Sequence, residues 1–372
     1  MDMLQKIFKH GELTLIAKYK KSQLVKHDLQ DLFWECTLTC NAACKHCGSN
    51  AERKKYDGEL STDEIVKAFA QIAKAMSASK ILINVTGGEP LLRKDLCEVM
   101  SYASSLGFHW GMTSNGMLFN DEIIDKLKNA NMETISISID GIGKTHDEFR
   151  GVAGSYEKIL ENIEKLKKAK FVKHLQVTTI FHKGNFAELE QLYDMVSRLG
   201  LDSWRVGIID PIGRGRKNED LLLDGIEIIQ LLDFIKRKNK KGKLRIAYAC
   251  PGFLGLDYEK TVRGYYFYCR TGINVASILH NGDLFVCPNV ERRPEFIQGN
   301  IRIDSFADVW NNKYTQYRTL NRTRCDYCEK CEQWEYCLGG AYHTWDFENS
   351  LQKRCPYDLV LKGDQNVEQT VK

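Results

Sequence analysis

The sequence lacks a strong net charge, a long apolar run and a secretion signal. Its formal charge is +4 over 372 residues, which does not indicate nucleic acid or a membrane as the main partner. No apolar run reaches the length of a transmembrane helix, and the first residues, Met1-Asp-Met-Leu-Gln-Lys6, contain no signal-peptide core. We therefore expect a cytoplasmic protein that binds neither nucleic acid nor membrane.

Cysteine is unusually frequent, with 13 residues in the chain. Because the cytosol keeps thiols reduced, a disulfide framework is not expected, and clustered intracellular cysteines indicate metal binding. Ten of them fall into two groups, which are Cys40, Cys44 and Cys47, and then Cys269, Cys287, Cys325, Cys328, Cys331, Cys337 and Cys355. The scattered thiols Cys36, Cys97 and Cys250 are expected to be small core residues.

Short apolar segments alternate with amphipathic ones between Asp31 and Asp224. Strands are expected at 32–36, 81–86, 108–113, 134–139, 174–181 and 203–209. Helices are expected at about 61–79, 93–106, 120–130, 155–169 and 186–199. The first helix begins with the capping box Ser61-Thr-Asp-Glu64. Repeated strand–helix units predict an α/β fold with a parallel sheet, here an incomplete barrel of six units over residues 31–224.

The remaining chain divides into three further segments. Residues 1–30 form an N-terminal extension, with a strand expected at 12–19. A helical linker is expected over 225–265, because a helix begins near 224 and the β/α alternation stops near 244. Residues 266–372 form a cysteine-rich domain. The lysine-rich run at 236–243 is either a solvated helix end or a contact for an acidic peptide.

Four short motifs follow consecutive predicted strands. They are Cys40–Cys47, Gly87-Gly-Glu-Pro90, Thr113-Ser-Asn-Gly116 and Ser138-Ile-Asp-Gly141. In parallel β/α folds the ligand site lies at the carboxyl ends of the strands. We therefore expect the four motifs to lie at one site.

The first motif, with the spacing C-x3-C-x2-C, offers three thiolates rather than four. A structural zinc site closes with four protein ligands, and His46 is too close to Cys47 to chelate well together with it. Three thiolates on a [4Fe–4S] cluster leave one iron open for another ligand. Cys40, Cys44 and Cys47 are therefore predicted to bind such a cluster.

This loop, followed by the Gly-Gly-Glu-Pro motif, resembles the cluster loop of radical S-adenosylmethionine (SAM) enzymes. The resemblance implies that SAM occupies the open iron and is cleaved reductively to a 5′-deoxyadenosyl radical. The radical would abstract hydrogen from a substrate, with electrons from a donor such as flavodoxin or ferredoxin. The resemblance also implies SAM contacts, by His46 at adenine, by Gly87, Gly88 and Glu89 at the amine, by Ser138 at ribose, by Arg150 at the carboxylate, and by Asn115 along the pocket.

Each SAM contact has a plainer alternative. His46 could be a surface loop residue, and Gly87-Gly88 an ordinary turn after a strand. Ser138 could be a strand-end hydroxyl, and Arg150 a partner in a surface salt bridge. Asp140 is expected to order its turn through an Asx bond rather than to transfer a proton.

The second cysteine group resembles the SPASM domain of radical SAM proteins, which carries one or two auxiliary [4Fe–4S] clusters. A hairpin around Asn281-Gly282 would place Cys269 and Cys287 at its base. The resemblance implies a distal cluster bound by four thiolates, with zinc as the alternative ion, and its ligands are Cys328, Cys331, Cys337 and Cys355. Ala341 stands where the family pattern has a cysteine of the proximal cluster, and Cys325 or, less readily, Cys250 could replace it.

SPASM proteins mostly modify peptides or proteins. Our first hypothesis is therefore a radical SAM oxidoreductase that installs a crosslink or similar modification in a ribosomally made peptide. The N-terminal extension is short for a leader-binding domain, so a separate leader-peptide-binding protein is a further expected partner. Pro288 replaces the aspartate of sulfatase-maturing relatives, which disfavours maturation of a partner enzyme. The alternatives are porphyrin side-chain modification and, in another class, a non-catalytic metal-binding or electron-transfer protein.

Overall fold

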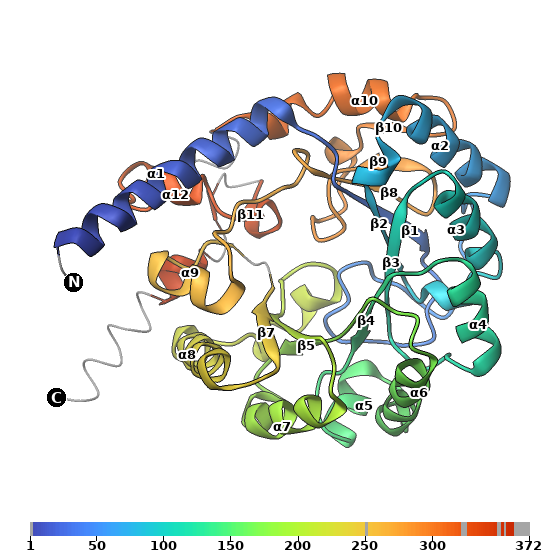
Figure 1. The fold of residues 1–372 in the computed structure, drawn as a ribbon, viewed down its shortest axis with the longest axis horizontal. Helices are drawn as coiled ribbons and strands as arrows, with labels where there is room; N and C mark the ends of the chain where they lie inside the picture. Colours follow the sequence, from blue (N-terminus) through green and yellow to red (C-terminus); the bar gives the residue numbers. More distant parts are fainter. Residues whose placement is uncertain (1–2, 250–251, 321–325, 348–350, 353–354, 361–372) are drawn as a thin grey trace.

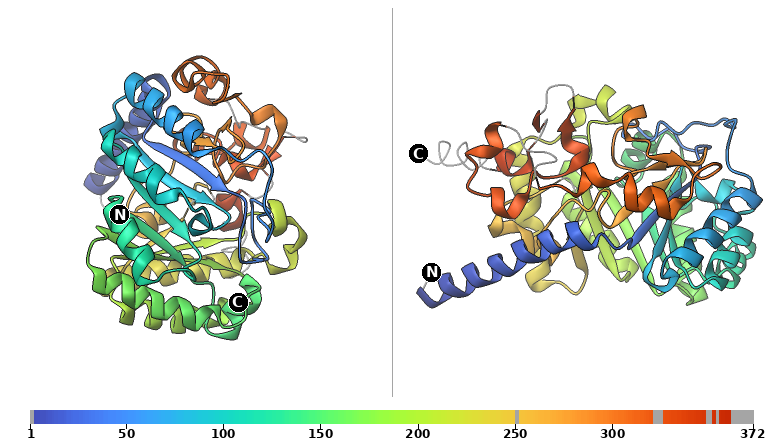
Figure 2. Two further views of the ribbon diagram at one scale, coloured as in Figure 1. Left: turned by 90° about the vertical axis from the view of Figure 1, so that its right-hand side faces the viewer. Right: turned by 90° about the horizontal axis from the view of Figure 1, so that it is seen from above.

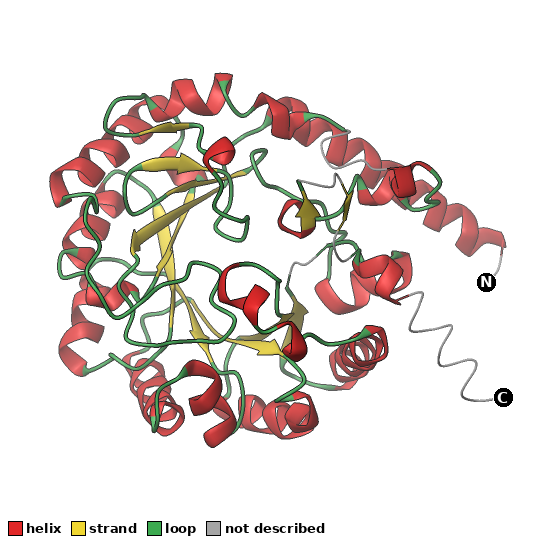
Figure 3. Ribbon diagram, turned by 180° about the vertical axis from the view of Figure 1, so that it is seen from behind, coloured by secondary structure: helices red, strands yellow, loops and turns green. Residues whose placement is uncertain are grey.

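The computed structural model describes residues 3–249, 252–320, 326–347, 351–352 and 355–360 (Figure 1). Its centre is a curved ten-stranded sheet with the order β10-β9-β8-β1-β2-β3-β4-β5-β6-β7. The helices lie outside the strands, as the view from behind shows (Figure 3). Because β7 and β10 are the two ends of this order, the described sheet is an unclosed barrel. The predicted partial α/β barrel is thus confirmed.

Seven of the strands form consecutive parallel pairs from β1 to the β7 edge of the sheet. They are β1 (Asp31–Thr37), β2 (Leu82–Gly87), β3 (His109–Ser114), β4 (Thr134–Ser138), β5 (His174–Phe181), β6 (Ser203–Ile208) and β7 (Arg245–Tyr248). The other described strands are β8 (Val275–Ile278), β9 (Asp283–Phe285) and β10 (Gly299–Asn300), with β11 (Trp345–Asp346) and β12 (Leu351–Gln352) as a separate pair.

The described α-helices cover the barrel and build part of the cysteine-rich region. They are α1 (Met3–Lys26), α2 (Thr62–Ala75), α3 (Leu96–Ser105), α4 (Asp121–Asn129), α5 (Lys144–Arg150), α6 (Ser155–Ala169), α7 (Leu189–Leu199), α8 (Gly225–Lys241), α9 (Leu256–Arg263), α10 (Phe306–Asn312), α11 (Asp326–Glu329) and α12 (Trp334–Cys337). The capping box at the start of α2 is present, with both Ser61 and Glu64 making their bonds.

The core forms because the strands and the inner helix faces are apolar at matching periods. In α2 the buried residues Ile65, Phe69 and Ile72 recur at helical spacing and face the sheet. Trp34, Trp110 and Trp204 of three different strands are completely buried. Burial of such large side chains fixes the register of the strands, and with it the positions of the loops at their carboxyl ends.

Strand β1 occupies a central place in the sheet. It pairs in parallel with β2 on one side, and with β8 on the other, where Asp31 lies opposite Val275. The antiparallel hairpin of β8 and β9 then carries Cys287 just beyond its end, as the sequence predicted. The proposed boundary at residue 266 therefore crosses one continuous sheet, which ties the cysteine-rich region to the barrel.

Two sequence predictions on secondary structure are wrong. Residues 12–19 belong to helix α1 rather than to a strand, because Leu13, Lys20 and Gln23 share one buried helix face. The β/α alternation also does not stop near 244, since β7 follows α8 and pairs with β6. Figure 2 shows α1 running along one side of the molecule and extending past it at the N-terminal end.

Candidate functional site

The loop from Cys40 to Cys47 leaves the carboxyl end of β1 and is held by the end of helix α5. The backbone N–H groups of Ala43 and Lys45 donate to the carbonyls of Arg150 and Phe149, at 2.9 and 3.0 Å. Cys40 N donates to the carbonyl of Glu52, which closes the loop on its other side. The loop is thus fixed by backbone bonds, so its three thiols keep a defined arrangement.

Two of the thiols of this loop lie beside N–H donors, one of which is the guanidinium of Arg150. Cys40 and Cys44 are buried, and burial raises the pKa of the Cys40 thiol to about 11. Arg150 Nη1 lies 3.5 Å from Cys44 Sγ, and Ala42 N donates to Cys40 Sγ at 3.4 Å. Such N–H donors stabilise thiolates once metal displaces their protons.

The segment after β6 contacts the same loop. The sequence did not predict this contact. Arg214 Nε donates to Cys44 O at 2.7 Å, and its Nη1 donates to Ala51 O at 2.8 Å. Arg214 Nη2 is buried and has no hydrogen-bond partner among the described residues. A Cβ at Gly213 would lie 2.5 Å from the carbonyl of Cys47, so this close approach requires glycine. The turn-rich composition of 210–216 was the available signal.

The glycine pair after β2 packs against the start of the cysteine loop. A Cβ on Gly87 would lie 2.1 Å from Thr37 O, and one on Gly88 would lie 2.2 Å from Thr39 O. Gly88 N donates to Thr37 O at 2.7 Å, and Glu89 N to Thr39 O at 2.9 Å. The glycines therefore allow β2 to dock on the strand end that carries the cysteines.

Glu89 joins the second and third motifs. Its carboxylate is fully buried and accepts hydrogen bonds from Ser114 Oγ at 2.9 Å, Asn115 N at 2.8 Å and Leu91 N at 3.2 Å. Burial raises the pKa of Glu89 to about 6, although these hydrogen bonds oppose the rise. Asn115 Nδ2 in turn donates to Asn41 Oδ1 at 2.6 Å, inside the cysteine loop.

The fourth motif reaches the loop through a buried ion pair. Arg150 Nη2 and Nε lie 2.5 and 2.6 Å from Asp140 Oδ2, while Asp140 Oδ1 accepts from Ile180 N at 2.7 Å. Burial opposes ionisation, but the charge of Arg150 lowers the pKa of Asp140. Asp140 thus has these long-range partners in place of the expected Asx role, and the salt bridge of Arg150 is buried rather than on the surface. The structure therefore brings all four motifs together.

Three rings stack beside the loop. His46 stacks on Phe149 with centroids 4.8 Å apart, and Phe149 stacks on His182 at 3.9 Å. Burial, with a smaller effect of Arg150, lowers the pKa of His46 to about 3, so the imidazole is neutral. A neutral, flat ring at this position suits stacking on adenine. Ser138 lies buried at the end of β4, opposite Thr178 of β5.

An open pocket of about 480 Å³ lies beside the cysteine loop. Its lining is mostly apolar with one arginine, and consists of Thr39, Cys40, Asn41, Arg53, Leu92, Met117 and Val152. The pocket gives a ligand access to the loop.

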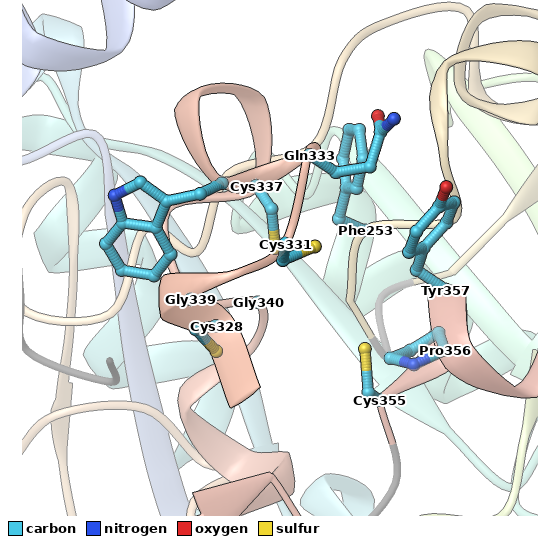
Figure 4. Close-up of a pocket in the computed structure, with 11 residues that line it drawn as sticks. Phe253, Cys328, Cys331, Gln333, Cys337, Gly339, Gly340, Cys355, Pro356 and Tyr357 are labelled. Atoms are coloured by element: carbon cyan, nitrogen blue, oxygen red, sulfur yellow. The ribbon is translucent and has the colours of Figure 1, made fainter. Parts of the chain in front are cut away.

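Four cysteines of the C-terminal group surround a second pocket (Figure 4). They are Cys328, Cys331, Cys337 and Cys355. Burial raises the pKa of Cys337 to about 12, and the thiols of Cys331, Cys337 and Cys355 are close enough to influence one another. Four soft donors around one space fit an iron–sulfur cluster. Within the described ranges no three Cys, His, Asp or Glu side chains are grouped to hold a single metal ion.

The site expected for the proximal auxiliary cluster has fewer thiols among the described residues than the distal site. Cys269 Sγ accepts from Tyr342 N at 3.3 Å, and Cys287 lies within electrostatic range of Cys269. Ala341, at the family's cysteine position, is fully buried. Two thiols among the described residues do not complete a four-thiolate set, and Cys250 and Cys325 lie outside the described residues. His343, which the sequence did not single out, lies here with Nε2 3.5 Å from Asp210 Oδ1.

Two family models match the chain. The radical SAM superfamily model covers residues 34–196, and the SPASM model, described as an iron–sulfur cluster-binding domain, covers 269–332. The AdoMet-dependent heme synthase of Oleidesulfovibrio alaskensis is 30% identical over 82% of this chain and 79% of its own length. This chain belongs to the radical SAM superfamily and carries a SPASM domain. It therefore binds SAM and a [4Fe–4S] cluster, together with auxiliary iron–sulfur clusters.

Other relatives of this radical SAM protein differ in their named activities. The AdoMet-dependent heme synthase of Methanosarcina barkeri is 29% identical over 89% of this chain and 96% of its own length. The mycofactocin maturase MftC of Mycobacterium tuberculosis is 27% identical over 83% and 77%. The solved structure of Streptococcus suis SuiB bound to S-adenosylmethionine has 17% identity and a TM-score of 0.67, and the match covers 86% of this chain and 76% of SuiB, which shows a shared fold. No helix in the described part of the chain is both long and apolar enough to cross a membrane.

The residues present fit the first cluster and the distal auxiliary cluster. At the first site, Arg150 contacts the Cys44 thiol and Arg214 binds the carbonyl of Cys44, while the buried carboxylates of Asp140 and Glu89 carry the opposite charge. The N–H donors at the thiols, together with the buried Arg214 Nη2 that has no hydrogen-bond partner among the described residues, suit an anionic group. At the distal site four thiols share one pocket.

Proposed function

We propose that this radical SAM protein abstracts hydrogen from a peptide or protein and thereby installs a crosslink or a related modification. Cys40, Cys44 and Cys47 hold the first cluster in this proposal, and the distal cysteines hold an auxiliary one. When bound, the cluster and SAM supply a hydrogen-abstracting radical. A flavodoxin or ferredoxin supplies the electron, and a separate protein presents the peptide leader.

The chain's own residues bind and orient SAM. Arg150 has N–H donors left after its contacts with Asp140 and Cys44, and these can receive the SAM carboxylate. His46 offers a neutral ring for adenine, and Ser138 a hydroxyl for ribose. The backbone at Gly87-Gly88 and the ionised carboxylate of Glu89 attract the amine.

The lining of the pocket beside Cys40 is the observation that supports a peptide substrate. Leu92, Met117 and Val152 offer apolar contacts, while Arg53 offers one positive charge. These groups suit a chain segment that has apolar side chains and a single acidic group. In addition, the mycofactocin maturase MftC and the PqqA peptide cyclase of Rhizobium meliloti are among the relatives.

Two arginines near the barrel mouth already have partners in the chain. Arg292 forms an ion pair with the buried Glu35, and Arg216 lies 2.8 Å from Glu291. A porphyrin with several carboxylates needs unpaired cations around it. The internal pairing of Arg292 and Arg216 therefore favours a less highly charged substrate.

Porphyrin side-chain chemistry is the second candidate. The observation that favours it is the match to 96% of the length of the Methanosarcina barkeri heme synthase, compared with 77% for MftC. Both candidate functions use the same radical chemistry and differ in the substrate that binds at the mouth of the barrel.

The deciding experiment measures 5′-deoxyadenosine release by the anaerobically reconstituted protein. Peptides encoded beside the gene and iron coproporphyrin III are supplied in parallel, with mass spectrometry of each substrate. We expect release coupled to a mass change in a peptide. Coupled change in the porphyrin alone contradicts the peptide proposal. Joint replacement of Cys40, Cys44 and Cys47 by alanine should abolish release, whereas Cys97→Ala, a thiol of α3 outside both groups, should leave it unchanged.

A further inference from the structure

Lys20 of α1 is a buried cation between two cysteine-bearing segments. Its side chain is 2% exposed, and Nζ donates to Phe267 O at 2.5 Å and also to Tyr336 O. Phe267 lies two residues before Cys269, and Tyr336 lies directly before Cys337. Lys20, Cys269 and Cys337 line one small cavity, and α1 runs beside α12 at this place (Figure 1).

The two carbonyl groups accept from two of the three N–H donors of Lys20 but do not balance its charge. The other charged groups that face it are Glu259 and Arg263 of α9. These two are themselves fully buried and form an ion pair at 2.5 Å. Glu259 is further engaged by Phe267 N and Leu254 N, at 2.5 and 2.9 Å. The three charges together leave one net positive charge in the interior.

A buried net charge is costly unless an opposite charge lies nearby. Cys337 is the other titratable group that faces Lys20. Four thiolates around a [4Fe–4S] core make a net anion, and Cys337 belongs to the four-cysteine pocket. The cluster therefore supplies the negative charge that the described protein groups around Lys20 do not.

We infer that Lys20 is a positioning residue for the SPASM centre. The positive charge of Lys20 holds the auxiliary cluster at Cys328, Cys331, Cys337 and Cys355 and raises the reduction potential of that cluster. The reduced cluster carries one more negative charge than the oxidised one, so a nearby cation stabilises it more strongly. The two carbonyl bonds of Lys20 also tie the segments of Cys269 and Cys337 to each other. The inference rests on the proposed cysteine ligands but not on the substrate.

The test compares Lys20→Met with Lys20→Arg in the full-length chain. Both are built on a protein in which Cys40, Cys44 and Cys47 are alanine, so that the auxiliary signal is observed alone. After anaerobic reconstitution, iron per chain is measured and the cluster is titrated with dithionite under electron paramagnetic resonance. Lys21→Met is the matched control, because Lys21 is the exposed neighbour on the same helix.

We expect Lys20→Met to lower the midpoint potential, while Lys20→Arg and Lys21→Met keep the parent value. Loss of auxiliary iron from Lys20→Met but not from Lys20→Arg supports the same conclusion, because the charge is then needed to retain the cluster. A Lys20→Met protein with the iron content and midpoint potential of the parent overturns the inference. An equal loss of iron or equal shift of potential in Lys20→Met and Lys20→Arg also overturns it, because such a result indicates a packing role alone. If the parent itself lacks auxiliary iron, the ligand assignment has failed instead.

Discussion

Replacement of Arg150 by alanine should destabilise the protein strongly and in a pH-dependent way. The change leaves the carboxylate of Asp140, which is fully buried, with Ile180 N as its remaining hydrogen-bond donor among the described residues. Breaking a buried ion pair by removing one partner costs about 3–5 kcal/mol. The loss is limited, however, because Asp140 can bind a proton instead of staying charged.

That limit can be worked out from the ordinary pKa of aspartate. Each pH unit above a pKa of about 3.9 costs about 1.4 kcal/mol, so protonating Asp140 costs about 4 kcal/mol at pH 7 and about 1.5 kcal/mol at pH 5. In the unaltered protein the lowered pKa of Asp140 contributes stability that is present above the unfolded pKa and lost as the pH falls. We therefore expect a loss of about 3–4 kcal/mol at pH 7 that shrinks to about 1.5 kcal/mol at pH 5.

The assay is urea unfolding of the cluster-free chain in reductant at both pH values. Arg237→Ala serves as control, because its ion pair with Glu190 is exposed and should matter little at either pH. The double variant Asp140→Asn with Arg150→Met should lose less than Arg150→Ala, since no charge is left unpaired. A loss below about 1 kcal/mol at pH 7, or one independent of pH, refutes this account of the site.

Two further predictions concern the second motif. Gly88→Ala places a Cβ 2.2 Å from Thr39 O, so we expect the cysteine loop to shift and about four irons to be lost, while auxiliary iron remains. Gly11→Ala, where no atom of the described residues lies within 4 Å, is the control, and equal iron in both proteins contradicts the docking role. For Glu89, whose pKa is raised to about 6, the carboxylate forms as pH rises through that value, so SAM affinity measured by calorimetry should increase from pH 5 to 7. Glu89→Gln should abolish this increase, and an unchanged pH profile rejects Glu89 as the amine partner.

The sequence predicted the barrel well because its signals are local. Strands β1 to β6 and their helices follow from apolar periodicity and caps such as Ser61. Helix α1 was missed because its buried face includes the polar residues Lys20 and Gln23, which hide the helical period. The pairing of β8 with β1 was missed because register between distant segments leaves no local pattern.

The same distinction holds for the candidate site. The motifs on the strand ends could be placed on one rim, since parallel strands present their carboxyl ends together. The interaction partners within that rim could not be predicted. The ion pair of Arg150 with Asp140 and the hydrogen bond of Arg214 to the carbonyl of Cys44 form only after the loops have folded. The incomplete proximal set of thiols at Ala341 stays a prediction, because Cys250 and Cys325 lie outside the described residues.

The pairing of β1 with β8 has a consequence for how the protein matures. Asp31 at the start of β1 and its ion-pair partner Arg270, just before β8, are 239 residues apart. At typical synthesis rates the ribosome needs roughly 10–50 s to make that stretch. Until then one edge of β1 is unpaired and can pair with a wrong strand. The cysteine loop follows directly after this strand. Iron insertion at Cys40–Cys47 is therefore best suited to the finished chain, and a nascent chain released before residue 275 should aggregate rather than accept a cluster.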